Sequence, residues 1–421
     1  MKKIYADVLV LGAGAAGLAA AAKAKELGAE HVVLLDEKEE LGGVLPQCIH
    51  PGFGLHYYRE DLTGPEFAFR LYEKVRNLGV EVHNQAYAIE LIPRKYDEKI
   101  VRASSPEGLL DIHAKTVIFA TGARERQRYE IGIIGYRPIG VYTAGQAQTM
   151  MDLYGMMPGK EIVIVGSGDV GLIMARRFAL QGAHVKAVIE ILPYPGGLTR
   201  NIQQCLIDFG IPLYLSHKVI SVNGTKRVEG VIVGKVDEKF NTIPGSEFEI
   251  KCDTLIVSAG LLPRVELLMR AGAFMDPATK SAVVNEYLET TIPGVFLAGN
   301  ALVINDLVDY AAEQGEAAAT SAIKFIQEGG FPSCVQKSVV KGRNVRLIVP
   351  QLITGENDVF FYGRVSQPEE DVYLKVPEVG MKLRMLRVKP PEMLRFKIRK
   401  KQFENLEGDK ITISVEPRSE G

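Results

Sequence analysis

The opening 36 residues of this chain constrain its fold more than any other stretch of the sequence. The apolar run Val8–Leu11 predicts a buried strand, and the pattern G-x-G-x-x-G follows it directly at Gly12–Gly17. An alanine-rich helix is expected over Leu18–Leu27, and a second strand over Val32–Leu35 ends at Asp36. A strand, a glycine-rich turn, a helix and a strand that ends in an acid are typical of a dinucleotide-binding unit.

Each part of this motif has a physical task. Gly12 permits the tight turn, Gly14 lets backbone N–H groups approach a pyrophosphate, and Gly17 allows the helix and strand to pack closely. The helix N-terminus offers unpaired N–H donors and a positive dipole to the phosphates. The carboxylate of Asp36 can accept hydrogen bonds from a ribose diol, so we expect a dinucleotide site here.

The same pattern occurs again in the middle of the chain. A strand over Glu161–Val165 precedes G-x-G-x-x-G at Gly166–Gly171, and a strand over Val185–Ile189 ends at Glu190. In both copies the acid lies 19 residues after the third glycine, and a Gly-Gly pair follows the acid by six and seven residues. Repetition of these offsets predicts two dinucleotide-binding domains in one chain.

Composition narrows the class of protein. A length of 421 residues fits two or three domains, and a net charge of −1 gives no indication of nucleic acid or an anionic membrane as a partner. Four widely separated cysteines without C-x-x-C spacing indicate a reducing compartment and argue against a disulfide framework. Because no apolar run reaches the length of a membrane span, we expect a cytoplasmic protein with no direct membrane span.

Between and after the two motifs, several stretches have the apolar and polar pattern that is typical of β-strands. Lys99–Ala103 with Leu109–His113 predicts a hairpin, and a buried strand is expected to follow over Thr116–Gly122. Met381–Lys401 carries nine basic residues and one acid, which fits a solvated sheet face or, as the sharper interpretation, a docking surface for a partner subunit. This basic stretch belongs to a predicted small β domain with strands at Arg343–Val349, Val359–Val365, Val372–Val376, Met393–Ile398 and Lys410–Val415.

With these motifs in place, the chain resembles a two-dinucleotide flavoprotein of the pyridine-nucleotide:flavin oxidoreductase family. The turn Ala120-Thr121-Gly122 and the segment Gly294–Asn300 match the family's crossing between domains and its return to the flavin. The resemblance implies an α/β fold with two Rossmann-like three-layer FAD/NAD(P)-binding domains, the second inserted in the first, plus a small C-terminal all-β domain. The implied FAD-binding domain covers 1–125 and 266–330, the NAD(H)-binding domain 126–265, and the β domain 331–421.

The resemblance carries site residues over to this sequence. At Asn300 the sequence departs from the family, which usually has an aspartate. FAD is expected at Gly12, Gly14, Ala15, Ala16, Gly17, Asp36, Glu37, Gly42, Gly43, Ala120, Thr121, Gly122, Gly299 and Asn300. NAD(H) is expected at Gly166, Gly168, Asp169, Val170, Gly171, Glu190 and Gly260, with Gly196-Gly197 repeating the Gly42-Gly43 pair.

Three stretches resemble a narrower group: Leu45–His50, Ala120–Arg126 and Gly168–Arg177. They are similar to the FAD/NAD oxidoreductase found beside anaerobic-type glycerol-3-phosphate dehydrogenases, and to flavoprotein subunits of opine, sarcosine and proline dehydrogenases. That implies a hetero-oligomer with a dehydrogenase subunit, and leaves open whether an iron–sulfur subunit joins it. In such proteins hydride passes between the nicotinamide and the flavin. Glu190 favours NAD(H), since a carboxylate repels a 2′-phosphate, although Arg200 lies close in sequence.

Cys48 is the candidate for a second redox function. It lies five residues after Gly43, in a loop expected near the flavin, where it could act as a nucleophile or simply pack. Cys205, Cys252 and Cys334 are expected to be packing or surface residues. No metal is expected, because Cys48 with His50 and His56 is one ligand short of a closed zinc shell, and the other histidines lack ligand spacing.

Three functions therefore stay open. The first is an electron-transferring FAD subunit that exchanges hydride with NAD(H) and electrons with a partner dehydrogenase. The second is a stand-alone NADH oxidase or a thiol or persulfide reductase that uses Cys48. The third is a non-catalytic flavin-binding assembly subunit, and the intact second motif with its own acid, Glu190, argues against it.

Overall fold

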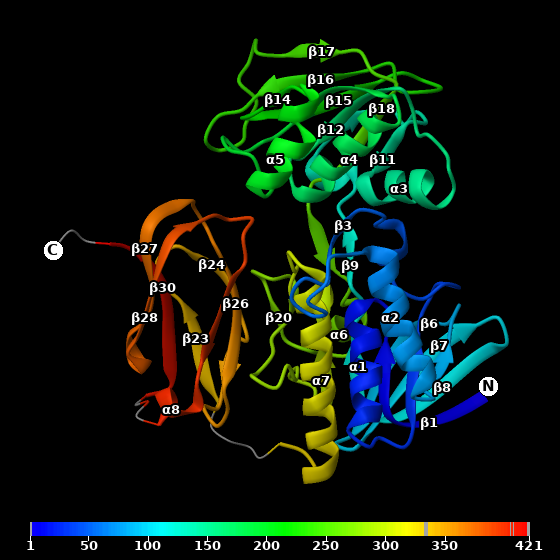
Figure 1. Ribbon diagram of the computed structural model, residues 1–421, viewed down its shortest axis with the longest axis vertical. Coiled ribbons are helices and arrows are strands. Elements are labelled where there is room, and N and C mark those ends of the chain that lie inside the picture. The colour runs from blue at the N-terminus through cyan, green and yellow to red at the C-terminus, as the bar shows by residue number, and fades with distance from the viewer. Residues whose placement is uncertain (1, 332–335, 405, 407, 419–421) are drawn as a thin grey trace. The chain divides into compact units, whose positions relative to one another are not determined.

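The computed structural model describes residues 2–331, 336–404, 406 and 408–418 of the chain. The chain forms two compact units (Figure 1). The first unit contains residues 1–123 and 263–421, and the second contains residues 124–262. The chain therefore passes from the first unit into the second once, between residues 123 and 124, and returns once, between residues 262 and 263.

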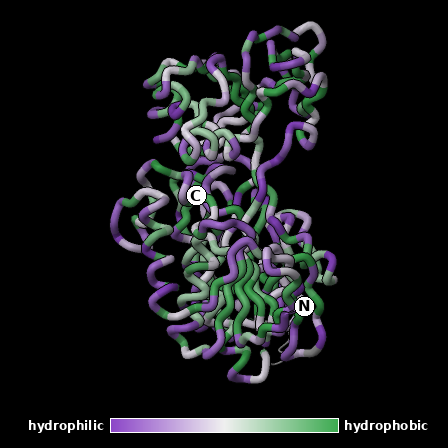
Figure 2. The backbone as a smooth tube through the Cα atoms, turned by 90° about the vertical axis from the view of Figure 1, so that its right-hand side faces the viewer, coloured by the Kyte–Doolittle hydropathy of each residue, from purple (hydrophilic) through white to green (hydrophobic). Residues whose placement is uncertain are grey.

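A seven-stranded sheet with mostly buried strands is the centre of the first unit, and Figure 2 shows these strands as a hydrophobic block. Strand β1, which ends with the apolar run Val8–Leu11, pairs in parallel with both of its neighbours, β2 and β8. In sheet order the strands are β5 (Glu81–His83), β2 (Val32–Leu35), β1 (Lys2–Leu11), β8 (Gly108–Phe119), β7 (Glu98–Ser105) and β6 (Tyr87–Lys95), with β22 (Val295–Leu297) also paired to β8.

Three long helices and one short one pack in the same core as this sheet: α1 (Ala15–Glu26), α2 (Gly64–Asn77), α7 (Val308–Glu328) and the short α6 (Glu266–Arg270). Helix α1 consists largely of alanine, which lets its neighbours approach its backbone closely. A Cβ atom added to Gly315 of α7 would lie 2.0 Å from the Ala16 carbonyl oxygen. Helix α2 begins with a capping box in which Thr63 and Glu66 satisfy each other's backbone N–H groups.

The second unit repeats this plan on a smaller scale. Its five-stranded parallel sheet contains, in order, β11 (Val141–Thr143), β18 (Thr254–Val257), β12 (Glu161–Val165), β13 (His184–Ile189) and β14 (Leu213–Tyr214). Residues of α3 (Ala144–Gln148), α4 (Asp169–Leu180) and α5 (Thr199–Cys205) form one core with this sheet. A second core is shared with a mixed sheet of β10 (Ile134–Gly135), β15 (His217–Asn223), β16 (Gly230–Lys235) and β17 (Phe248–Ile250), in which β10 pairs with β15 in parallel and the other pairs are antiparallel.

The C-terminal residues form two small sheets with a buried cluster of their own. One contains β25 (Leu352–Ile353), β23 (Lys337–Lys341), β30 (Lys410–Pro417), β27 (Glu369–Val376) and β28 (Met381–Val388), in that order. The other contains β24 (Val345–Val349), β26 (Val359–Val365) and β29 (Leu394–Ile398). These sheets belong to the first compact unit, because Leu347, Val349 and Tyr362 are buried in the same core as the first sheet.

One local expectation was wrong. The segments expected as one arm of a hairpin and as a separate buried strand form a single strand, β8, which pairs with β7 near its start and with β22 near its end. Strands β6 and β28, and the antiparallel strands β15, β16 and β17 of the second unit, were not predicted. Alternation of side chains reports burial on two faces, and it does not show where a strand changes its partner. Among the described residues, no helix has the length and apolar character to cross a membrane.

Candidate functional site

The first glycine-rich turn is built by close backbone contacts. The Gly12 N–H donates to the Leu35 carbonyl oxygen at 2.8 Å, and Gly12 has a φ of +98°. A Cβ atom at this position would lie 2.4 Å from the Ala120 carbonyl oxygen, and one at Gly17 would lie 1.7 Å from the Gly12 carbonyl oxygen. Glycine is therefore required at both positions by the fold alone.

Gly14 differs, because the described residues leave the space beside it open. It is the N-cap of α1 with a φ of −75°, and no side chain caps this helix. An added Cβ would meet only the Gly43 Cα, at 3.9 Å. The first N–H groups of α1 thus have no side-chain partner at the cap and border an open space, the arrangement that receives a phosphate.

The carboxylate of Asp36 lies at the same edge of the sheet and is only 7% exposed. One oxygen accepts the Ala13 N–H at 2.5 Å and the other accepts the Lys38 N–H at 2.8 Å. A carboxylate has about four acceptor positions. Two positions are consequently left, one on each oxygen, which is the number that a ribose diol needs.

The second unit reproduces each of these backbone hydrogen bonds. The Gly166 N–H donates to the Ile189 carbonyl oxygen at 2.8 Å, and Gly168 is the N-cap of α4, again with no side-chain cap and with nothing within 4 Å of an added Cβ. Glu190 is 6% exposed, and it accepts the Ser167 and Leu192 N–H groups at 2.9 Å each. The repeat predicted from spacing is therefore also a repeat of hydrogen bonds.

Ser167 is a site residue that the sequence analysis missed. Its side chain is fully buried, its hydroxyl donates to Glu190 Oε2 at 2.6 Å, and it accepts the Gly196 N–H at 2.8 Å. Glu190 thus has three acceptor positions filled where Asp36 has two. A hydroxyl-bearing residue between the first two glycines was the only indication in the sequence.

Most of the other residues expected at FAD lie around the first turn. Gly299 (φ +65°) approaches Ala16 of α1, since its Cβ would lie 2.8 Å from the Ala16 Cβ. The Gly42 N–H donates to the Ala13 carbonyl oxygen at 2.8 Å. Ala15, Ala16 and Gly17 form the first turn of α1, and Ala120 follows β8 beside Gly12.

Four of the residues expected at FAD use polar groups in hydrogen bonds or an ion pair within the protein. The Thr121 hydroxyl donates to the Arg264 carbonyl oxygen at 2.6 Å, and the Gly122 carbonyl oxygen accepts the Arg264 N–H at 3.0 Å. The Asn300 side-chain oxygen accepts the Asn305 N–H at 2.9 Å. Glu37 forms a bidentate ion pair with Arg264 that holds the pKa of this carboxyl below its usual range. The Glu37 carboxylate is therefore occupied by the ion pair with Arg264.

The residues expected at the nicotinamide cofactor are arranged less uniformly. Asp169 begins α4, and its Oδ1 accepts the Leu198 N–H at 2.8 Å and the Asn201 side-chain amide at 2.6 Å. Gly171 packs against Gly166, while Val170 and Gly260 are exposed. Asp169 therefore ties the segment after Gly196-Gly197 to the start of the helix.

Cys48 lies at the end of a short 3-10 helix, η1 (Leu45–Gln47), and is half-buried. Its Sγ lies 3.4 Å from the Val44 carbonyl oxygen, and its backbone packs against Gly64 at the start of α2. The loop that follows is held by Asp309 of α7, which is 1% exposed. The Asp309 carboxylate accepts the backbone N–H groups of Gly54, His56 and Tyr57 at 3.2, 2.9 and 2.8 Å.

The remaining cysteines differ from Cys48 in exposure. Cys205 and Cys252 are buried, and burial raises the pKa of both thiols, that of Cys252 to about 12. None of these three cysteines forms a disulfide, and Cys334 lies outside the described residues. Within the described part of the chain, no three His, Cys, Asp or Glu side chains gather closely enough to hold a metal ion.

Comparison with known proteins agrees with this construction. Residues 6–315 match the family described as pyridine nucleotide-disulphide oxidoreductase. The chain is 27% identical over 308 residues to the NAD(P)H sulfur oxidoreductase (CoA-dependent) of Pyrococcus abyssi (strain GE5 / Orsay), covering 71% of this chain and 63% of that protein. It is also 27% identical over 315 residues to sarcosine oxidase subunit alpha of Corynebacterium sp. (strain U-96), covering 71% of this chain and 31% of that protein.

The chain thus spans less than two thirds of the length of these two relatives. Among solved structures, thioredoxin reductase of T. acidophilum has a TM-score of 0.63 at 24% identity, covering 77% of this chain and all but 1% of that one. This likeness confirms the expected α/β fold. Because the family match covers most of the sequence, the chain belongs to the pyridine nucleotide-disulphide oxidoreductase family.

Proposed function

We propose that this chain exchanges hydride between NAD(H) and FAD and passes electrons to or from a partner dehydrogenase. FAD, when bound, supplies a ring that accepts a hydride from NADH or returns one to NAD⁺. The protein's part is to hold each dinucleotide by its phosphates and ribose. In this proposal FAD occupies the turn at Gly12–Gly17 with Asp36, and NAD(H) occupies the turn at Gly166–Gly171 with Glu190.

The observation that carries the proposal is the pair of equivalent turns, each with an open helix N-terminus and a buried acid. Glu190 also supports a preference for NAD(H). A 2′-phosphate would meet a carboxylate that is fixed by three hydrogen bonds and cannot turn away. Like charges forced together cost several kcal/mol, which corresponds to a preference of roughly a hundredfold or more.

Anaerobic mixing of the FAD-loaded protein with NADH or NADPH tests this preference. NADH is expected to bleach the flavin absorbance much faster than NADPH does. Glu190→Gln should reduce the difference between the bleaching rates with NADH and with NADPH. Glu190→Arg should reduce this difference further or make NADPH the faster donor. Glu238→Gln, an exposed position in the same unit, is the matched control and should behave as wild type. Equal rates with both nucleotides in the wild-type protein would exclude Glu190 as the selecting residue.

The partner dehydrogenase is supported by relatives and by the C-terminal sheets. Sarcosine oxidase subunit alpha is by its name one subunit of a larger enzyme. Strand β28 is the exposed edge of its sheet, with Leu386 75% exposed beside Arg387. Not all of the basic stretch is free for a partner, because Arg384, Arg395, Lys397 and Lys400 form ion pairs with acids of this chain.

The isolated chain itself offers a test of the partner. Sarcosine, proline and glycerol 3-phosphate should each fail to bleach the flavin of the isolated protein under anaerobic conditions, while NADH succeeds. Bleaching by any of these three compounds without another protein would show that no partner dehydrogenase is needed. We further propose that the protein works in the cytoplasm, where Cys48, Cys205 and Cys252 stay reduced.

A second candidate function is a thiol or persulfide reductase that uses Cys48. The observation that favours it is the half-buried thiol at the end of η1, five residues after Gly43. The relative from Pyrococcus abyssi is named as a sulfur oxidoreductase. Under this function Cys48→Ser would abolish NADH consumption with polysulfide or a small disulfide, while reduction of the flavin by NADH would persist. Unchanged turnover in Cys48→Ser would exclude it.

A further inference from the structure

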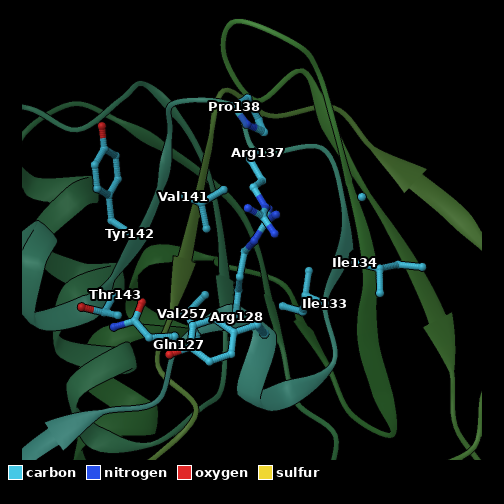
Figure 3. A pocket seen from close by; sticks show the side chains of 12 residues that line it. Gln127, Arg128, Ile133, Ile134, Arg137, Pro138, Val141, Tyr142, Thr143 and Val257 are labelled. Atoms are coloured by element: carbon cyan, nitrogen blue, oxygen red, sulfur yellow. The ribbon is translucent and has the colours of Figure 1, made fainter.

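The second unit contains a pocket of about 710 Å³ that neither cofactor turn uses (Figure 3). None of the residues Gly166–Gly171 lines it, and neither does Glu190. Its wall includes Gln127, Arg128, Ile133, Arg137, Val141 and Tyr142. All of these residues belong to the second unit, so the pocket is complete within that unit.

Two arginines give this pocket its charge. Figure 3 shows the side chains of Arg128 and Arg137 extending into the same space from opposite sides. The Arg128 guanidinium is fixed by a hydrogen bond from Nη1 to the Tyr136 carbonyl oxygen at 2.7 Å, directly beside Arg137 in the chain. Because Tyr136 precedes Arg137, this hydrogen bond holds the Arg128 guanidinium beside the backbone that carries Arg137.

Carboxylates of the neighbourhood do not neutralise this pair. Glu130 lies in the same short 3-10 helix, η2 (Arg128–Ile131), but both of its oxygens bind Arg124 at 2.9 Å and one accepts the Gln127 N–H at 2.8 Å. The Arg124 ion pair and this N–H lower the pKa of Glu130 to about 2. Within the described residues, neither Arg128 nor Arg137 has a carboxylate within ion-pair distance.

The loop that carries Arg137 is fixed at both ends. Gly135 has a φ of +97°, and a Cβ there would lie 2.4 Å from the Val222 carbonyl oxygen. Gly140 has a φ of +106°, and its Cβ would lie 2.6 Å from the Asp253 carbonyl oxygen. Between them the Ile139 N–H donates to the Lys226 carbonyl oxygen at 3.1 Å. The backbone on both sides of Arg137 is therefore anchored, while the Arg137 side chain itself is exposed.

The rest of the wall is apolar or can donate hydrogen bonds. Ile133 is buried, and Val141 packs into the same core beneath the pocket. A single guanidinium can satisfy one carboxylate by a bidentate pair, whereas two guanidinium groups together match the three terminal oxygens and double charge of a phosphate monoester. We propose that this pocket binds an organic phosphate, with the phosphate between Arg128 and Arg137 and the carbon skeleton against Ile133 and Val141.

Calorimetric titration of the FAD-loaded protein with phenyl phosphate tests the proposal, with saturating NAD⁺ present to occupy the second cofactor turn. Phenyl phosphate should bind at least tenfold more tightly than benzoate, which has the same ring and one carboxylate. It should also bind at least tenfold more tightly than inorganic phosphate, which lacks the apolar part. Comparable binding of inorganic phosphate would overturn the organic part of the proposal, and comparable binding of benzoate would overturn the role of the paired arginines.

Variants locate the site. Arg128→Met and Arg137→Met should each weaken phenyl phosphate binding at least tenfold, and Arg137→Lys should weaken it less than Arg137→Met. Lys239→Met removes one exposed positive charge from the same unit and should leave binding unchanged. Thermal midpoints of all variants within a few degrees of wild type would show that folding is intact. Equal affinity in the wild type and both arginine variants, or no binding at all, would refute the proposal, whatever the outcome of flavin reduction by NADH.

Discussion

Replacement of Gly14 by alanine separates binding of FAD from folding of the protein. Gly14 has a φ that alanine adopts without strain, and the added Cβ would meet nothing closer than the Gly43 Cα at 3.9 Å. Alanine caps a helix less well than glycine but is less flexible in the unfolded chain, and these two effects of about 0.5–1 kcal/mol oppose each other. The apoprotein of Gly14→Ala should therefore unfold within about 1 kcal/mol of wild type.

The same methyl group would stand where a phosphate must approach the N–H groups of α1. Overpacking of this kind costs about 1–3 kcal/mol, so the Kd for FAD should rise about ten- to a hundredfold. Wild-type protein at FAD a hundred times its Kd gains about 2.7 kcal/mol of stability, and after a hundredfold loss of affinity the gain falls to about 0.4 kcal/mol. The difference should lower the thermal midpoint of the FAD-loaded protein by several degrees.

Fluorescence titration of the apoprotein with FAD and thermal unfolding with and without FAD measure both effects. Gly168→Ala is the reciprocal control, since Gly168 is equally open and caps α4 in the second unit, so this variant should keep wild-type FAD affinity. Gly17→Ala is the opposite control and should fail to fold, because its Cβ would lie 1.7 Å from a backbone oxygen. Wild-type FAD affinity in Gly14→Ala would refute the assignment of FAD to the first turn.

Three further predictions concern other parts of the chain. At pH 8 a thiol reagent should modify Cys48 in the native protein faster than Cys205 or Cys252, whose pKa values are raised by burial; faster labelling of either buried cysteine, read by mass spectrometry, would contradict this. Burial lowers the pKa of Lys99, which is 1% exposed, from 10.5 to about 8. The unfolded chain therefore binds more protons between those values, and the free energy of unfolding should rise from about pH 8 to 10.5 by at most about 3 kcal/mol, a rise absent in Lys99→Met. Asp309→Ala should leave three backbone N–H groups without their acceptor and lower the free energy of unfolding by about 3 kcal/mol, whereas a loss below about 1 kcal/mol in denaturant titration would show that Asp309 does not hold the loop.

The sequence allowed the repeated part of the fold to be predicted because local chemistry specifies it. Gly12 and Gly17 face backbone oxygens that no other residue could approach, and Gly166 and Gly171 do the same in the second unit. Positions where only glycine fits can therefore be recognised from the sequence. The sequence did not show that β8 is one continuous strand, since its pairing with β1 runs along most of its length while its other edge changes partner from β7 to β22.

The site was predicted in outline and not in its bonds. Spacing placed Glu190 opposite its turn, but only the fold shows that the Ser167 hydroxyl occupies one of its oxygens. Glu37 follows Asp36 directly, yet it pairs with Arg264, more than 200 positions further along the chain. Arg128 and Arg137 belong to none of the motifs found in the sequence, so their pocket was not predicted. Contacts between residues far apart in sequence depend on tertiary structure, and no local pattern contains them.

The central claim is that this one chain holds FAD at the first turn and NAD(H) at the second, and that hydride passes between them. Anaerobic stopped-flow mixing of NADH with FAD-loaded wild type and Gly168→Ala tests it most directly. Wild type should bleach rapidly, while Gly168→Ala should retain its FAD and bleach at least tenfold more slowly at subsaturating NADH. Equal bleaching in both proteins, or none in the wild type, would contradict the claim.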